Sequence, residues 1–177
     1  MARRPRPPRS RTAEVLPASL NITDELDGLV AGLLDAGVDF AICGGIAVTV
    51  LSVPRFTKDI DLLVPGRALD AALAVARERS FVFEARPMTF DRGTPRERTV
   101  RRVTKLRGKA SLTLDLVLVE PAFGAVWDSR VEVEWRGRRI PVVSREGLAF
   151  MKRIAGRRQD RADLVLLGME KDDGPET

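Results

Sequence analysis

Residues 43 to 64 read CGGIAVTVLSVPRFTKDIDLLV, and this stretch decides how the chain folds. It holds a glycine pair, Gly44 and Gly45, and thirteen residues later two carboxylates, Asp59 and Asp61, at the start of an apolar run. Residues two apart on a strand project from the same side, so Asp59 and Asp61 face the same way. Like charges this close repel each other unless they are neutralised, and a shared divalent cation would neutralise them.

A third acid follows in a later strand. The run ASLTLDLVLV, residues 110–119, alternates cleanly, with Leu112, Leu114, Leu116 and Leu118 on one face. Asp115 lies on the other face with Thr113, Val117 and Val119, so it is a strand carboxylate in an apolar setting.

The surrounding pattern predicts an α/β (α+β) domain, a mixed β-sheet flanked by helices and followed by C-terminal helices. Thr23 and Ser144 are the expected N-caps of the first helix and of a helix that ends at Gly156. Helices are expected over residues 23–36, 46–52, 68–79, 144–155 and 160–169, and strands over 38–43, 58–64, 81–84, 97–106, 110–119, 131–135 and 138–143.

Length and charge indicate one cytoplasmic domain. We expect residues 1–20 to be a disordered basic Pro/Arg-rich tail, 21–170 a single domain and 171–177 a polar tail. Residues 1–12 carry five arginines and no acid, so the other 165 residues balance 25 basic against 25 acidic side chains. No apolar run approaches the roughly 18 residues of a membrane span.

Composition also excludes several kinds of site. The chain has no histidine, which rules out His-ligated zinc and Cys/His or Ser/His nucleophilic pairs. The single cysteine, Cys43, is expected to be a buried, inert thiol. CGGIAV does not match the dinucleotide-binding pattern G-x-G-x-x-G, and the acids open the second strand instead of closing it.

The densest basic stretch of the domain runs from Arg86 to Lys109, with nine Lys or Arg against Asp91 and Glu97. Two interpretations are equally open, a solvated hairpin and a surface that contacts phosphates.

The glycine turn, D-x-D and a later strand aspartate together resemble the nucleotidyltransferase superfamily related to polymerase β. Residues 144–164, SREGLAFMKRIAGRRQDRADL, look like the C-terminal helices of small bacterial members, including toxins of toxin–antitoxin pairs. The resemblance spans most of residues 38 to 167. It implies that Asp59, Asp61 and Asp115 hold Mg²⁺, with two ions expected, and that Asp115 holds the ion that activates the acceptor hydroxyl and could also act as its base.

The resemblance further implies a nucleoside triphosphate site at Gly44, Gly45, Thr57, Lys58 and Lys152. The second turn position is often serine in the family, and Gly45 leaves only backbone donors, for which Thr49, Arg55, Thr57 or Lys58 could compensate. Arg55 and Lys58 either touch the triphosphate or neutralise Asp59. Asp160 and Asp163 are expected to cap and orient the last helix, and Trp127 and Trp135 to pack.

Two functions are carried forward from the sequence. The first is a Mg²⁺-dependent nucleotidyltransferase that moves AMP or CMP onto a hydroxyl of tRNA, of a protein or of a small molecule such as an antibiotic. A toxin with a cognate antitoxin is the first choice among these roles. The alternative is a non-catalytic nucleotide-binding or antitoxin-like partner with the same fold.

Overall fold

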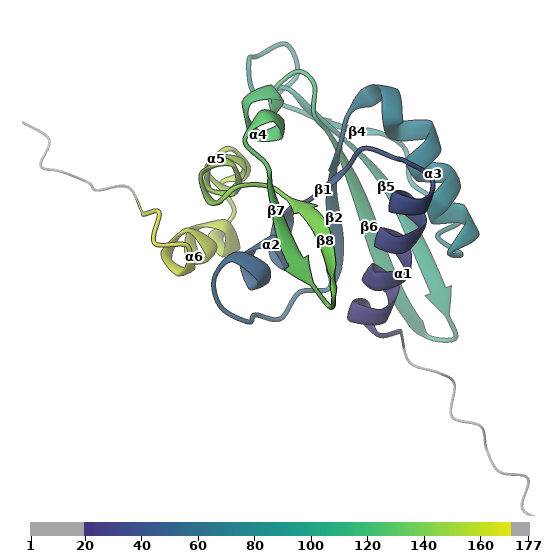
Figure 1. The fold of residues 1–177 in the computed structure, drawn as a ribbon. Helices are drawn as coiled ribbons and strands as arrows, with labels where there is room; N and C mark the ends of the chain where they lie inside the picture. The colour runs from purple at the N-terminus through teal and green to yellow at the C-terminus, as the bar shows by residue number, and fades with distance from the viewer. Residues whose placement is uncertain (1–19, 171–177) are drawn as a thin grey trace, which may run out of the picture.

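The computed structural model describes residues 20–170. They form a mixed eight-stranded sheet. Seven strands follow the order β3-β5-β6-β2-β1-β8-β7, and the eighth, β4, also pairs with β5. The expected mixed sheet with flanking helices is confirmed (Figure 1). The expected tails lie almost wholly outside the described residues.

The sheet joins segments that are far apart in the sequence. β6 runs parallel to β2 and antiparallel to β5, and β1 links β2 to the hairpin of β7 and β8. The strands are β1 (Ala41–Ile42), β2 (Asp59–Val64), β3 (Phe83–Glu84), β4 (Met88–Phe90), β5 (Arg98–Arg107), β6 (Ala110–Leu118), β7 (Val131–Trp135) and β8 (Arg138–Val142).

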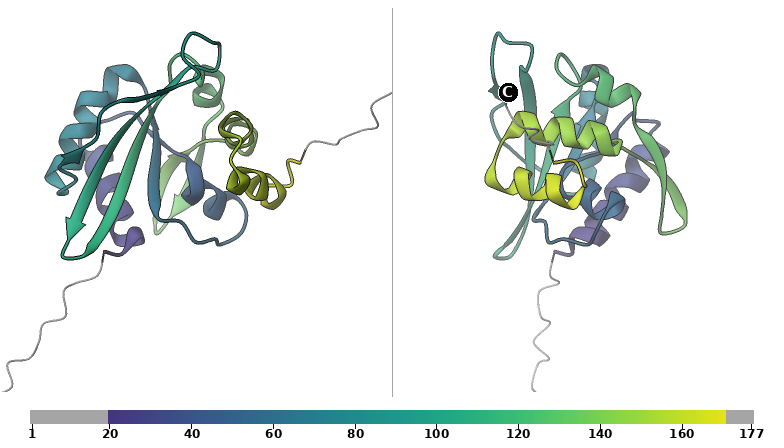
Figure 2. Two further views of the ribbon diagram at one scale, coloured as in Figure 1. Left: turned by 180° about the vertical axis from the view of Figure 1, so that it is seen from behind. Right: turned by 90° about the vertical axis from the view of Figure 1, so that its left-hand side faces the viewer.

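The helices form two layers. α1 packs beside α3 on one face, and α2, α4, α5 and α6 lie on the other (Figures 1 and 2). Their bounds are α1 (Ile22–Asp35), α2 (Gly44–Leu51), α3 (Leu69–Glu78), α4 (Gly124–Asp128), α5 (Arg145–Ala155) and α6 (Arg158–Leu166), with one 3-10 turn, η1 (Gly66–Ala68). None of the helices within residues 20–170 is both long and apolar enough to cross a bilayer.

The core lies where β2 and β6 run through the centre of the sheet. Ile60, Leu62, Leu114 and Leu116 are fully buried between the helical layers, which removes several apolar side chains from water in each strand. The two strands are therefore the most constrained part of the fold, and side chains at their ends are held firmly.

The expected boundaries of α1 and β1 were wrong, and α2 begins at Gly44, two residues earlier than expected. The N-cap of α1 is Asn21, whose Oδ1 accepts the Thr23 N–H at 2.9 Å, because asparagine satisfies free helix donors at least as well as threonine. β1 covers only Ala41–Ile42, because the N–H of Val38 is used to close α1 on the carbonyl of Leu33. Val38 and Phe40 are still buried, as expected.

The C-terminal part follows the sequence pattern more closely. Ser144 caps α5 through the Gly147 N–H at 3.0 Å, and Gly156 ends the helix at a φ of 65°. α6 begins and ends slightly earlier than expected, at Arg158 and Leu166. Three short elements, β4, α4 and η1, were not anticipated.

Candidate active site

Three aspartates, here called the strand carboxylates, lie on β2 and β6: Asp59, Asp61 and Asp115. Asp61 pairs directly with Asp115 in the parallel register, and Asp59 pairs with Thr113. Directly paired residues project from the same face, so all three carboxylates share one face of the sheet. The strand register therefore brings all three to one face of the sheet, without closing them into a metal site within residues 20–170. Their roles remain a proposal.

The glycine pair is required by what lies against it. A Cβ on Gly44 would stand 1.9 Å from Asp61 Oδ2, and Gly44 has a φ of +62°, a region that L residues rarely adopt. A Cβ on Gly45 would meet Thr57 Oγ1 at 2.6 Å and Arg55 Nη2 at 2.9 Å. A serine at position 45 would thus collide with Thr57, and the Thr57 hydroxyl occupies that space instead.

Asp61 is the strand carboxylate whose pKa is raised. Burial and then the negative charge of Asp115 raise the pKa of Asp61 to about 6. Lys152 and Arg157 act in the opposite direction without cancelling the rise. A carboxylate in this state gains from any cation that comes to lie beside it.

Asp115 is held by an arginine that sequence reasoning missed. Arg102 donates from Nε to Asp115 Oδ1 at 2.8 Å and from Nη2 to Oδ2 at 2.7 Å. This hydrogen bond is the main reason that the pKa of Arg102 is raised. The signal was present in the sequence, because a two-residue turn at Gly108 and Lys109 fixes the register that pairs position 102 with position 115.

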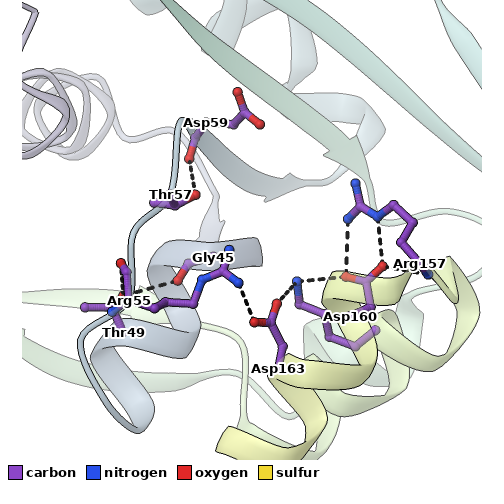
Figure 3. A network of polar contacts seen from close by, with 9 residues as sticks. Gly45, Thr49, Arg55, Thr57, Asp59, Arg157, Asp160 and Asp163 are labelled. Carbon is purple, nitrogen blue, oxygen red and sulfur yellow. Dashed lines mark hydrogen bonds and ion pairs between the residues drawn. The ribbon is translucent and has the colours of Figure 1, made fainter.

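A second group of charged side chains lies next to the strand carboxylates, where α5, α6 and the loop after α2 meet. This group, here called the helix cluster, consists of Arg55, Lys152, Arg157, Asp160 and Asp163. The Lys152 ammonium lies 3.0 Å from Asp160 Oδ1 and 2.7 Å from Asp163 Oδ2, and all three side chains are buried. Figure 3 shows Arg157 on Asp160 and Arg55 reaching Asp163 from the loop after α2.

Both acids of the helix cluster are paired with cations, although the buried Arg55 Nε and Asp163 Oδ2 make no hydrogen bond. Burial alone would raise the pKa of Asp160, but hydrogen bonds from Arg157 and Lys152 outweigh it and leave the pKa below its usual range. Asp160 Oδ2 also accepts the backbone N–H of Arg157 at 3.1 Å, so it caps α6, as expected. Lys152 is not a solvated surface residue: it is a buried cation beside the strand carboxylates.

Two adjoining cavities open around these residues. The polar chamber, about 290 Å³, has a wall made by the glycine turn, the loop before β2, the start of β2 and one residue of α6: Gly45, Arg55, Phe56, Thr57, Lys58, Asp59 and Gln159. The apolar chamber, about 310 Å³, is bounded by Cys43, Gly44, Met88, Phe90, Arg98, Val100, Val117, Phe123, Leu148, Met151 and Ala155. Both chambers share Asp61, Arg102, Asp115, Lys152, Arg157 and Asp160.

Of the site residues expected from the sequence, all but Thr49 border one of these chambers; the Thr49 hydroxyl instead contacts the backbone of Gly45 and Arg55. Asp59, Asp61 and Asp115 line the polar chamber together with Gly45, Thr57, Lys58 and Lys152, and Gly44 lines the apolar one. Arg55 borders the polar chamber but pairs with Asp163, not with Asp59. Cys43 is buried as expected, and burial raises the pKa of its thiol.

The basic stretch contains both paired and exposed cations. Arg98 pairs with Asp91, Arg101 with Glu84, and Lys105 with Glu25, in addition to the Arg102–Asp115 pair. Arg86, Arg92, Arg96 and Lys109 are exposed and form no ion pair within residues 20–170, so for them the choice between a solvated hairpin and a phosphate-contacting surface stays a prediction. Trp127 and Trp135 pack against the core, as expected.

The donor set suits a hard cation, although the carboxylates do not form a complete site in this conformation. Within residues 20–170, no three His, Cys, Asp or Glu side chains converge closely enough to hold a metal by themselves. Mg²⁺ is usually bound by one or two carboxylates together with water and substrate phosphates. The paired oxygens of Asp61 and Asp115 fit that requirement once Arg102 releases Asp115.

Comparison with solved structures identifies the fold. The lincomycin-bound lincosamide antibiotic adenylyltransferase LnuA aligns over 83% of this chain and 97% of its own, with a TM-score of 0.52 and 15% identity. The antibiotic-resistance factor ANT(2'')-Ia aligns over 81% and 80%, with a TM-score of 0.55 and 17% identity. An antigenic nucleotidyltransferase-like protein from Paracoccidioides brasiliensis aligns over 82% and 73%, with a TM-score of 0.51 and 19% identity.

These similarities establish that the chain has a nucleotidyltransferase fold of the polymerase β-like type. No protein-family model and no curated protein sequence matches the chain. At identities of this order the likeness fixes the fold, and the activity must be argued from the site.

Proposed function

We propose that the chain is a Mg²⁺-dependent nucleotidyltransferase that moves a nucleoside monophosphate from a triphosphate to a hydroxyl. The observation that carries the proposal is the pairing of Asp61 with Asp115 beside a glycine turn whose space Asp61 fills. In the structural relatives, LnuA is described as an adenylyltransferase, and ANT(2'')-Ia is seen with adenylyl-2''-tobramycin.

The triphosphate fits the polar chamber. Backbone N–H groups at the start of α2, the Thr57 hydroxyl and the Lys58 ammonium would contact phosphate oxygens there. Lys152, fixed by two aspartates, supplies a buried positive charge that offsets the negative charge of the phosphates.

Asp59, Asp61 and Asp115 would hold the magnesium, with two ions expected. Bound Mg²⁺ supplies charge stabilisation for the entering and leaving oxygens. Asp115 orients the acceptor hydroxyl and accepts its proton, and a cation beside Asp61 would offset the burial and repulsion that raise its pKa. Arg102 must leave Asp115 for this arrangement to form, and it then faces the shared part of both chambers.

The test is label transfer by the purified full chain. Incubation with Mg²⁺ and each α-labelled triphosphate, with and without total tRNA, protein and small alcohols, is expected to release pyrophosphate and to label an acceptor. Asp61→Asn should abolish both. Equal pyrophosphate release by the wild type and Asp61→Asn would refute the metal role.

A non-catalytic nucleotide-binding partner is the second candidate, and the Arg102–Asp115 pair is the observation that favours it, because that pair already satisfies Asp115. In this case the protein binds a triphosphate without Mg²⁺-dependent turnover. A toxin role with a cognate antitoxin stays a prediction. Growth arrest on expression that Asp59→Ala abolishes would support it.

A further inference from the structure

We propose that the acceptor is a small, uncharged hydroxyl compound with a largely apolar body, bound in the apolar chamber. This inference rests on the proposed nucleotidyl transfer and names its second substrate. It is carried by the placement of an apolar row of side chains directly next to the acid row of the sheet.

The strand registers define the two rows. Asp61, Asp115 and Arg102 lie opposite one another across β2, β6 and β5. Two residues further along the same face, Val117 pairs with Val100, which pairs with Met88 of β4. Same-face positions on a strand are about 7 Å apart, so the apolar row begins one side chain beyond the acids.

In-line chemistry assigns each chamber to one reactant. The attacking and leaving oxygens lie on opposite sides of the α-phosphorus. With the leaving pyrophosphate held in the polar chamber and the α-phosphate at the acids, the entering hydroxyl approaches from the apolar side. Its oxygen bonds to the α-phosphorus, the bond to the bridging oxygen breaks, pyrophosphate leaves with that electron pair, and the hydroxyl proton passes to Asp115.

The walls of the apolar chamber select against polar and charged acceptors. Apart from Arg98, which pairs with Asp91 and stacks on Phe90 at 5.0 Å, the side chains beyond the shared residues are apolar or cysteine. The acids of the lining are Asp61, Asp115 and Asp160, and Asp160 already binds two cations. A polycationic acceptor would therefore find only Asp61 and Asp115 among these described residues, and the proposed function already assigns both to the metal.

Size and charge also argue against a nucleic-acid acceptor. A volume of about 310 Å³ is at the lower end of the range for small-molecule sites. RNA binding relies on cations free to contact phosphates, and the cations that border this chamber, Arg98, Arg102, Lys152 and Arg157, are each paired with an acid of the chain.

Methionine methyl NMR tests the assignment without relying on turnover. Met88 and Met151 line the apolar chamber, whereas Met169 packs on the core outside it. In the full chain labelled with [¹³C-methyl]methionine, 2-phenylethanol is expected to shift the Met88 and Met151 signals saturably and to leave Met169 unmoved. Glucose and the RNA trinucleotide CCA, as polar probes, should shift neither.

A matched pair of variants locates the response. Met151→Trp fills the chamber and should abolish the Met88 shift, whereas Val165→Trp, on the exposed side of α6, should leave it unchanged. With Mg²⁺ and ATP present, wild type and Val165→Trp should convert ATP and 2-phenylethanol to the nucleotidyl ester. In Met151→Trp, the rate of ester formation should fall at least tenfold more than the rate of ATP hydrolysis.

The outcomes separate this inference from the proposed function. Mg²⁺ and α,β-methylene-ATP should shift the backbone amides of Gly44 and Gly45. No amide shift would count against the proposed function, whatever the alcohol does. Amide shifts without any response of Met88 and Met151 to the alcohol would overturn the acceptor assignment alone. A response of Met88 and Met151 to CCA would assign the chamber to RNA. A response to the nucleotide analogue that also blocks the alcohol would assign it to the nucleotide base, and either result would overturn the acceptor assignment.

Discussion

The aspartates of the strand carboxylates and those of the helix cluster lie around the same cavities, yet they differ in what surrounds them. In the helix cluster, Asp160 and Asp163 each contact at least one cation, and the pKa of Asp160 is lowered. Among the strand carboxylates, burial and a neighbouring acid raise the pKa of Asp61 to about 6. Compensated acids hold the structure together, and the uncompensated one is suited to chemistry.

The largest expected effect breaks the compensated group. Lys152→Met leaves Asp160 and Asp163 buried with one cation fewer each, which should lower the free energy of unfolding by about 3–5 kcal/mol. Arg153→Met, the next residue on α5 with an exposed side chain, should cost less than about 1 kcal/mol. Urea unfolding measures both, and equal effects would show that the helix cluster is not structural.

Asp61→Asn should raise the free energy of unfolding, whereas Lys152→Met lowers it. A raised pKa means that folded Asp61 holds its proton more tightly than the unfolded chain, so wild type loses stability as pH rises from about 4 to about 6. The neutral variant escapes this loss. Its stability relative to the wild type should therefore be similar near pH 4 and higher above pH 7, by up to about 3 kcal/mol, in metal-free buffer.

Unfolding of both proteins across this pH range checks the sign. A variant that is less stable than the wild type above pH 7 would mean that Asp61 is compensated as well, and the contrast between the two groups would disappear.

The next effect isolates the contact between the glycine turn and Asp61. Gly44→Ala places a methyl group 1.9 Å from Asp61 Oδ2, whereas Gly108→Ala adds one at nearly the same φ with no atom within 4 Å. Both pay the backbone cost of about 1–2 kcal/mol, so the extra loss in Gly44→Ala, about 1–3 kcal/mol, reports crowding against the carboxylate. Thermal unfolding of the two variants measures this difference.

The smallest effect on stability is expected for Arg102→Gln, which removes the cation paired with one of the strand carboxylates. The Arg102 side chain is 42% exposed but Asp115 is buried, so Arg102→Gln should lower the free energy of unfolding by about 1–2 kcal/mol, less than Lys152→Met. It also frees both oxygens of Asp115, so Mg²⁺ affinity measured by calorimetry should rise. Unchanged or weaker Mg²⁺ binding would favour the non-catalytic candidate.

The sequence predicted the convergence of the acids because alternation along two strands is a local pattern, and the parallel pairing of β2 with β6 then made Asp61 and Asp115 neighbours. The Arg102–Asp115 pair was also within reach, through the hairpin turn. The paired Lys152 and the apolar chamber were not, because they depend on how α5 and α6 pack on the sheet and on the short elements β4 and α4. Long-range packing of this kind leaves no periodic signal.

The most direct test of the account is to count bound Mn²⁺, used in place of Mg²⁺, by electron spin resonance in the presence of α,β-methylene-ATP. The wild type should bind the ion tightly, and a folded Asp61→Asn/Asp115→Asn protein should lose most of that binding. If the double variant binds as much Mn²⁺ as the wild type, the strand carboxylates do not hold the metal and the proposed chemistry is wrong.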